Sequence, residues 1–248
     1  MISGARDVLG RIYMNSIREI LPIKQKYVEN QEGVKFPQEH HPPARYFDDK
    51  IPDSWHPGPI NVLSGGEMAA HDNFTSQGDT VRIIGGGIGV SAVVAAWNVT
   101  PSGSVTVYEG GDRYLRQLRQ TIEINDVDDI VDVQHVAVGK PDSVWGEQGR
   151  VLDPRNLDQC DVLELDCEGA ELSILSNMSI RPRAIIVENH PSMGNYDNPT
   201  QVLDLLSDMD YEIESFYTNN RGERLSKEEF VNALAQSKPP IAVATSPT

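Results

Sequence analysis

A cluster of glycines in the first half of the chain constrains the fold more than any other feature. Residues 81–91 read Val-Arg-Ile-Ile-Gly-Gly-Gly-Ile-Gly-Val-Ser, and valines and alanines follow. This order predicts a buried strand, a tight turn and the start of a helix. Glycines let the backbone approach a ligand closely, and the helix that follows presents free N–H groups. The turn is therefore a candidate cofactor site, with an ordinary strand-to-helix turn as the alternative.

The spacing of the glycines separates two classes of cofactor. A dinucleotide fingerprint, G-x-G-x-x-G, needs its third glycine or alanine one place beyond Gly89. This chain instead has Gly85, Gly87 and Gly89 in the pattern G-x-G-x-G, which disfavours a nicotinamide-dependent oxidoreductase. The pattern resembles motif I of the class I S-adenosylmethionine-dependent methyltransferases, which implies that Gly85, Gly86, Gly87 and Gly89 contact that cofactor.

Charge excludes one large class of partners. The chain has 248 residues and a net charge of −16, from 37 acidic and 21 basic residues. Such a surface repels nucleic-acid backbones, so no DNA or RNA partner is expected.

No apolar stretch is long enough to cross a bilayer and no secretory signal is visible. We therefore expect a soluble cytoplasmic protein, and contact with a membrane surface stays open. The acidic surplus is also typical of salt-adapted organisms, an acidic mesophilic protein being the alternative.

The first 78 residues are expected to form an appendage to a domain that spans residues 79–248. Residues 5–21 have the apolar spacing of an amphipathic helix, which would dock on the core or on a second subunit in a homo-oligomer. Prolines recur across 22–59, which predicts an irregular arm. A short helix is expected around 67–70. Histidines 40, 41 and 56 lack partners at ligand spacing, so they predict no metal site.

Strands and helices alternate through the rest of the chain. Such alternation predicts an α/β, doubly wound sheet. The resemblance to the class I methyltransferases implies a Rossmann-like sheet of seven strands with an antiparallel last strand. After the glycine turn, strands are expected at 104–108, 130–138, 162–165, up to 188, 211–217 and 241–245, and helices at 91–98, 113–124, around 202–206 and 227–235. Residues 140–159 are expected to be a loop-rich connection. Cys160 and Cys167 flank one short strand, a poor geometry for a bridge, so we expect reduced thiols.

Acidic residues follow two of the predicted strands. Glu109 ends the second strand, where a carboxylate can accept hydrogen bonds from ribose hydroxyls. Asp166 follows the fourth strand, and Glu168 and Glu171 follow at the next helix start. Helix capping explains Glu168 and Glu171 but not Asp166. Ligands of open α/β sheets bind outside the carboxyl ends of the strands, so these carboxylates mark a candidate site.

Residues 163–175, Leu-Glu-Leu-Asp-Cys-Glu-Gly-Ala-Glu-Leu-Ser-Ile-Leu, resemble the signature of the FkbM family of methyltransferases. The likeness extends from about Val81 to His190 and includes the glycine turn, Glu109 and the segment 185–191. It implies S-adenosylmethionine as cofactor and methylation of an oxygen, with a sugar, glycolipid or other small metabolite as substrate. Val136 and Ala137, on the third strand, would lie beside the adenine, although a buried core strand explains them as well.

The same resemblance implies the groups at the reacting centre. Candidates for the base that removes the hydroxyl proton are His190, Glu188, Asp166 and Glu168, and Asp166 would also contact the cofactor. His190 has a suitable ordinary pKa, near 6.5. Asp166 and Glu168 could alternatively hold a divalent ion, but no third ligand is identifiable, so no metal site is predicted.

Three positions depart from the family pattern. Ile83 stands where an acidic residue usually precedes the first glycine, and Gly110 stands where a proline commonly follows the strand-two glutamate. Glu164 replaces a frequent lysine, which we interpret as a change on the surface. The loss of the carboxylate at Ile83 favours an alternative function, a catalytically inactive methyltransferase-like subunit that binds a partner.

Overall fold

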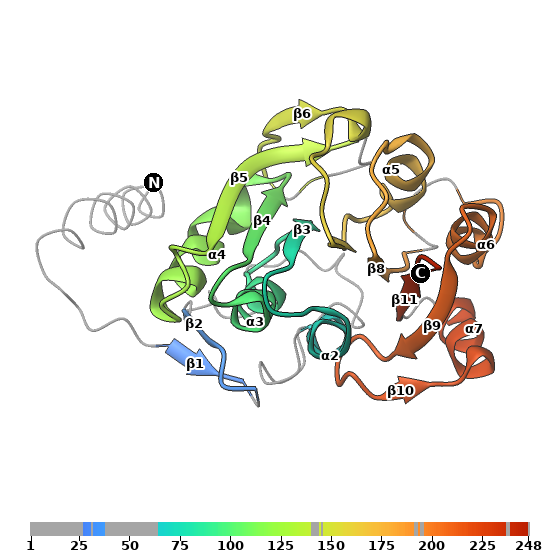
Figure 1. Cartoon of the computed structure of the whole chain (residues 1–248), viewed down its shortest axis with the longest axis horizontal. Helices are drawn as coiled ribbons and strands as arrows, with labels where there is room; N and C mark the ends of the chain where they lie inside the picture. The colour runs from blue at the N-terminus through green and yellow to red at the C-terminus, as the bar shows by residue number, and fades with distance from the viewer. Residues whose placement is uncertain are drawn as a thin grey trace, which may run out of the picture.

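The computed structural model describes residues 27–30, 32–37, 64–139, 144, 146–190, 193, 196–236 and 239–247. The predicted helix at 5–21 and most of the expected arm at 22–59 lie outside this part of the chain. The described residues form a nine-stranded sheet with helices on both faces and a separate two-stranded hairpin (Figure 1). None of the described helices is long and apolar enough to cross a membrane.

The large sheet has the strand order β10-β9-β11-β8-β7-β3-β4-β5-β6. Its strands are β3 (Thr80–Ile84), β4 (Ser104–Glu109), β5 (Val131–Val138), β6 (Arg150–Leu152), β7 (Val162–Leu165), β8 (Ala184–Glu188), β9 (Glu212–Tyr217), β10 (Arg224–Leu225) and β11 (Ile241–Thr245). Neighbours from β6 to β8 run parallel, whereas β11 is antiparallel to both β8 and β9. The predicted doubly wound sheet with an antiparallel last strand is confirmed, and the short strands β6 and β10 extend its two edges.

The strand order reverses between β3 and β7. From β3 the chain moves outward through β4 and β5 to β6, and it then returns to place β7 on the other side of β3. The register pairs Ile84 with Leu165, the last residues of these two strands. Open α/β sheets bind ligands in the crevice at such a reversal. The glycine turn begins after Ile84 and Asp166 follows Leu165, so both predicted site segments start at this point.

Helices enclose a separate apolar core on each face of the sheet (Figure 1). One face carries α2 (Gly65–Phe74), α3 (Val90–Val99) and α4 (Asp112–Ile124), and the other carries α5 (Glu171–Asn177), α6 (Gln201–Asp208) and α7 (Lys227–Ala235). Ile83 and Leu118 lie in the first core, and Leu163 and Phe230 lie in the second. Because the central strands are covered on both faces, they read as nearly continuous apolar runs.

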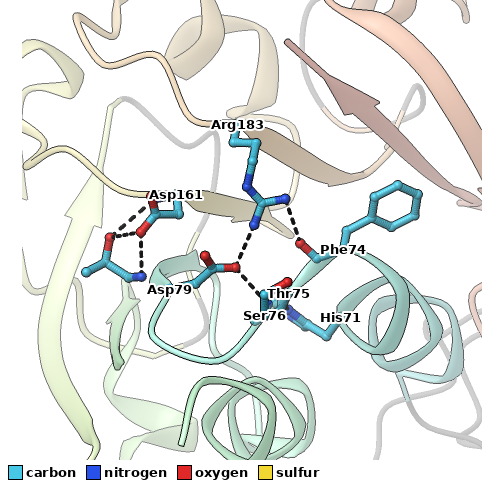
Figure 2. A network of polar contacts seen from close by, with 8 residues as sticks. His71, Phe74, Thr75, Ser76, Asp79, Asp161 and Arg183 are labelled. Atoms are coloured by element: carbon cyan, nitrogen blue, oxygen red, sulfur yellow. Dashed lines mark hydrogen bonds and ion pairs between the residues drawn. The ribbon is translucent and has the colours of Figure 1, made fainter. Parts of the chain in front are cut away.

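Polar contacts close the amino-terminal edge of the sheet (Figure 2). The Arg183 guanidinium, just before β8, donates to the Asp79 carboxylate at 2.6 Å and to the carbonyl oxygen of Phe74 at 3.2 Å. Asp161, just before β7, accepts from the backbone N–H and the hydroxyl of Thr80 at 2.7 and 2.8 Å. These bonds fix the end of α2 and the starts of three strands to one another, at the edge opposite the glycine turn.

A hairpin docks on α4 within the segment expected to be an irregular arm. Its strands are β1 (Tyr27–Glu29) and β2 (Lys35–Pro37). The side chain of Asn125, which follows α4, pairs with both backbone groups of Lys35: its oxygen accepts at 3.0 Å and its nitrogen donates at 2.6 Å. Val34 and Phe36 are buried in the core of that face. This part of the segment therefore contributes to the main domain's core.

The long elements agree with the sequence to within one or two residues, and α7 and β11 agree at both ends. The short elements differ. The connection expected at 140–159 contains β6 and a 3-10 turn, η4 (Pro154–Asn156), and α2 is longer than the short helix expected at 67–70. Two- and three-residue strands such as β10 and β6 carry too few residues for an alternating pattern, so sheet pairing alone defines them.

Candidate functional site

The glycine turn between β3 and α3 brings two strand ends into direct contact. Gly85 has a φ of +94°, and a Cβ there would lie 1.6 Å from the carbonyl oxygen of Asp166. Only glycine allows this approach of the β3 and β7 ends. Gly87 has a φ of +49°, and a Cβ there would meet nothing within 4 Å. The backbone at Gly87 therefore borders open space, as a ligand-binding turn requires.

Two of the predicted cofactor glycines also pack closely against the core. A Cβ at Gly86 would lie 2.3 Å from Val107, and one at Gly89 would lie 2.6 Å from Leu118. Gly89 is also the N-cap of α3, where no side chain caps the helix. The first N–H groups of α3 are therefore left for a ligand or for solvent.

Glu109 ends β4 and closes the glycine turn. One carboxylate oxygen accepts from the Gly87 N–H at 3.0 Å, and the other accepts from the Gly111 N–H at 2.9 Å. Burial raises the pKa of this carboxyl group, and the two backbone donors partly offset that effect. Each oxygen keeps a further lone pair, so Glu109 can accept additional hydrogen bonds at the turn.

Three of the four predicted catalytic candidates meet at the carboxyl ends of β7 and β8. Asp166, Glu188 and His190 each place one polar atom within 4.8 Å of the other two. The Nε2 atom of His190 lies 3.7 Å from Asp166 Oδ1 and 3.4 Å from Glu188 Oε1. The Asp166 side chain is 32% exposed, whereas those of Glu188 and His190 are 6% and 8% exposed. Solvent therefore reaches this cluster from the Asp166 side.

Glu171, in the first turn of α5, fixes the orientation of the His190 ring. Its carboxylate lies 3.0 Å from His190 Nδ1 and accepts from the Tyr196 hydroxyl at 2.8 Å. It also accepts from the Gly169 N–H at 3.2 Å, so the capping explanation holds in part. Burial and Glu171 raise the pKa of the Tyr196 phenol, which keeps this hydroxyl a donor.

Glu67, in α2, is a buried carboxyl group that the sequence analysis does not single out. Its side chain lies within hydrogen-bonding reach of Glu188, and its Oε2 atom has no hydrogen-bond partner among the described residues. Gly65 and Gly66 let α2 begin flush against the sheet, since a Cβ at Gly66 would lie 2.4 Å from Ile241. The only sequence signal is a Gly-Gly-Glu helix start ahead of the first strand, which is too common to mark a site.

The cluster couples the ionisation of its members. Burial and Glu188 raise the pKa of Glu67 and that of Asp166. Burial alone would raise the pKa of Glu188, but His190, together with Glu67 and Asp166, outweighs burial and lowers it. Burial alone would lower the pKa of His190, yet Glu188, Glu171 and Asp166 together raise it well above its ordinary value. Positive charge is therefore strongly favoured at the centre of this cluster.

Glu168, the fourth catalytic candidate, lies outside the cluster. It occupies the turn between β7 and α5 with a φ of +53°, next to Gly169 with a φ of +95°. It is not among the residues whose polar atoms meet around His190. Its charge acts on the cluster from a distance, as one of the smaller effects that raise the pKa of Asp166.

Val136 and Ala137 occupy different surroundings on β5. Both are buried, at 1% and 2% exposure. Val136 belongs to the apolar core together with Tyr108, as the core-strand alternative predicts. Ala137 lies beside the end of β4, where a Cβ on Gly110 would be 3.5 Å from its Cα.

Two of the positions that depart from the family pattern are buried. Ile83 is fully buried in the core beneath α3, where a carboxylate would be costly. Glu164 is 2% exposed, accepts from the Ser91 hydroxyl at 2.9 Å and lies 2.5 Å from His71 Nε2. The other ring nitrogen of His71 lies 2.8 Å from the hydroxyl of Thr75, and both residues stand at the end of α2 in Figure 2. The interpretation of Glu164 as a surface change is wrong, because it joins β7 to α2 and α3.

The sheet order, the glycine turn and the acidic strand ends together define a Rossmann-like methyltransferase fold of class I. Residues 118–213 match the methyltransferase FkbM domain, which confirms the resemblance seen at 163–175. The match covers less than half of the chain and begins after the glycine turn.

Solved structures with a similar arrangement include several methyltransferases. A putative O-methyltransferase from Klebsiella pneumoniae is 13% identical, with a TM-score of 0.47 over 78% of this chain and 83% of that one. An O-methyltransferase from Bacillus cereus in complex with SAH is 13% identical, with a TM-score of 0.47 over 76% and 84%. A SAM-dependent O-methyltransferase from Thermotoga maritima is 17% identical, with a TM-score of 0.47 over 73% and 64%. No curated protein matches the chain.

Proposed function

We propose that this protein is an S-adenosylmethionine-dependent methyltransferase that methylates a hydroxyl group of a sugar, a glycolipid or another small metabolite. One observation carries the proposal: Gly87, Glu109 and Asp166 lie at the carboxyl ends of the neighbouring strands β3, β4 and β7, where the strand order reverses. The Gly87 N–H donates to Glu109, and the Asp166 carbonyl oxygen lies against Gly85. The FkbM match over residues 118–213 supports the same reaction.

The residues at the crevice fit the three parts of the cofactor. Open backbone at Gly87 and the uncapped start of α3 suit the carboxylate of the methionine portion. The remaining lone pairs of Glu109 suit the ribose hydroxyls. Ala137, beside Gly110, is placed to border the adenine, with Val136 supporting it from the core.

When bound, the cofactor supplies a methyl group on a positively charged sulfur. The residues at the strand ends would contribute by aligning the acceptor oxygen with that methyl group, and such alignment provides much of the rate. The hydroxyl proton passes to a base. We assign that base to the group formed by Asp166, Glu188 and His190, whose polar atoms lie within 4.8 Å of one another. Glu168, which is not part of this group, is the weakest of the four candidates.

A catalytically inactive subunit that binds a partner is the second candidate. Ile83 favours it, because the acidic residue usual at that position in the family is replaced by a core side chain. Asp166 and Glu171 retain the family's carboxylates and favour the enzyme. The two functions differ in whether the chain binds the cofactor.

Calorimetric titration with S-adenosylhomocysteine separates the two candidates. The wild-type chain should bind one equivalent. Glu109→Ala should weaken binding by about 1–3 kcal/mol, because it removes the acceptor for the ribose hydroxyls. Glu123→Ala, the same change at an exposed position of α4, should leave the dissociation constant unchanged. An absence of heat at any salt concentration would overturn the proposal and favour the inactive subunit.

A further inference from the structure

We propose that Asp166, Glu188 and His190 bind a divalent cation, with Glu67 as a third carboxyl group on the buried side. The site lies at the carboxyl ends of β7 and β8, beside the glycine turn. The inference concerns these side chains alone and does not depend on the proposed methyl transfer.

The cluster contains more acceptors than donors. Ionised carboxylates only accept hydrogen bonds, yet oxygens of Asp166 and Glu188 lie within 4.8 Å of each other, and the neighbouring Glu67 is buried as well. Glu188 Oε1 accepts from the Asn219 side chain, whereas Glu67 Oε2 is buried without a partner among the described residues. A buried acceptor left unpaired costs about 1–3 kcal/mol. A cation between the carboxylates would satisfy several acceptors at once.

The orientation of His190 is that of a metal ligand. A metal-binding histidine almost always directs its other ring nitrogen to a carboxylate or carbonyl oxygen. Here Nδ1 lies 3.0 Å from Glu171, and Tyr196 holds the same carboxylate in place. The Nε2 atom is thereby directed toward Asp166 and Glu188, and a bound cation would take the place of the proton that it carries between them.

The distances within the cluster suit a shared ion. Ligand atoms about 2.1 Å from one Mg²⁺-sized ion lie at most about 4.2 Å apart. His190 Nε2 lies 3.7 Å from Asp166 Oδ1 and 3.4 Å from Glu188 Oε1. Both distances are within that limit, and the exposed Asp166 provides a route of entry.

Charge favours a divalent ion over a shared proton. A proton on His190 supplies one positive charge beside the carboxyl groups of Glu67, Asp166 and Glu188, whereas a divalent cation supplies two. Carboxylates with one imidazole suit Mg²⁺ or Mn²⁺ better than metals that prefer thiolates. We therefore choose Mn²⁺ as the probe, since its paramagnetism reports the ligands directly.

The test is a Mn²⁺ titration of the full chain, stripped with EDTA and free of cofactor. We expect one tightly bound Mn²⁺ per chain by calorimetry. Asp166→Asn should lower the affinity at least about tenfold, in line with the loss of a ligand. Asp208→Asn, the same change at an exposed position of α6, should leave it unchanged and so accounts for non-specific attraction to a chain of charge −16.

Pulsed EPR tests the role of the histidine. The Mn²⁺ signal of the wild type should show coupling to one nitrogen, and His190→Gln should abolish that coupling. Glu171→Gln should keep the coupling and weaken Mn²⁺ binding by about 10–100-fold, as expected of a residue that positions a ligand. Thermal unfolding of each variant without metal identifies any variant that fails to fold. Glu67→Gln, on α2, provides a further substitution in the site if another variant fails to fold.

Three outcomes would overturn the cation site: no stoichiometric binding by the wild type at millimolar Mn²⁺, equal affinities for Asp166→Asn and Asp208→Asn, or no nitrogen coupling in the bound state. Titration with S-adenosylhomocysteine in the presence of EDTA is scored separately. Cofactor binding without Mn²⁺ binding would reject this inference alone, and Mn²⁺ binding without cofactor binding would reject only the proposed function.

Discussion

Gly85 and Gly87 both have positive φ but differ in what surrounds them. A Cβ at Gly85 would lie 1.6 Å from a backbone oxygen of the β7 turn, whereas one at Gly87 would meet nothing within 4 Å. Gly85→Ala must push β3 and β7 apart, so we expect it to destabilise the fold by more than about 3 kcal/mol. Gly87→Ala adds only the cost of a left-handed residue, about 1–2 kcal/mol. Chemical denaturation of the two variants measures both values.

The two glycine variants serve as controls for each other, because the chemical change is the same and the turn is the same. Equal losses of unfolding free energy would show that backbone conformation alone, and not the contact with Asp166, requires glycine at position 85. The close approach of the β3 and β7 ends would then contribute nothing to stability.

The two cysteines should be unreactive while the protein is folded. Burial raises the pKa of the Cys160 thiol to about 12 and raises that of Cys167 well above its ordinary value. Since the thiolate is the reactive form, little of either thiol is reactive at pH 8. We expect Ellman's reagent to report almost no fast-reacting thiol in the native protein and two after unfolding in guanidinium chloride. One fast thiol in the native state would contradict the buried position of its cysteine.

Part of the candidate site could be predicted because its residues directly follow predicted strands in the sequence. The glycine turn, Glu109 and Asp166 each follow an apolar run, so their place at strand ends could be predicted from sequence alone. Glu67 and His71 could not be predicted in this way, because they reach the sheet from a helix that precedes it and touch residues about a hundred positions away. Such contacts depend on tertiary packing, which local patterns do not specify.

The buried side chain of Glu164 joins two helices, α2 and α3, to strand β7 of the sheet. Glu164 on β7 contacts His71 on α2 at 2.5 Å and Ser91 on α3 at 2.9 Å. Glu164→Ala would leave both partners buried without an acceptor, so we expect a loss of about 3–5 kcal/mol in unfolding free energy. Urea denaturation followed by circular dichroism measures the loss.

A glutamate on β9 provides the matched control for this helix-joining group. Glu212 is exposed, and Glu212→Ala should change the unfolding free energy by no more than about 0.5 kcal/mol. If Glu164→Ala proves equally mild, the contact with His71 does not hold α2 on the sheet. The position of Glu67 in the candidate cation site would then need another explanation, since α2 carries that residue as well.

The bounds of an element could be predicted where residues within or next to the element carry the signal, and not where pairing with a distant strand defines it. Helix α7 begins with Ser226, whose side chain and that of Glu229 cap each other's backbone N–H groups, and its bounds follow from that local signal. Strands β6 and β10 exist only through pairing with β5 and β9. The family resemblance contributed the antiparallel last strand, which element patterns alone leave open.

Across the whole molecule, the two edges of the sheet carry opposite kinds of polar contact. The amino-terminal edge is closed by paired groups, such as Arg183 with Asp79. The carboxyl-terminal edge gathers carboxyl groups that mainly face one another and His190. Function is therefore expected only at the second edge. Some of the acidic residues behind the net charge of −16 therefore lie close together at the carboxyl-terminal edge of the sheet, where they repel one another in the folded chain.

The surplus of negative charge predicts a salt-dependent stability. Folding brings carboxylates closer together than they are in the unfolded chain, and salt screens their repulsion over a Debye length that falls from about 10 Å at 0.1 M to about 3 Å at 1 M. We expect the melting temperature to rise with KCl by about 2–4 °C for each kcal/mol recovered. Chloride is the anion of choice, because sulfate would also strengthen apolar burial.

The shape of that salt response distinguishes the two origins considered for the acidic composition. In an ordinary acidic protein, screening is nearly complete near 1 M, so the melting temperature should level off there. In a protein adapted to a salt-rich habitat we expect the rise to continue into multimolar KCl. A titration with Mn²⁺ at low KCl provides the internal comparison, since an ion bound at Asp166 would stabilise the fold at far lower concentration by mass action. A melting temperature that ignores KCl throughout would show that the repulsion is already balanced within the fold, and it would remove the salt-adaptation hypothesis.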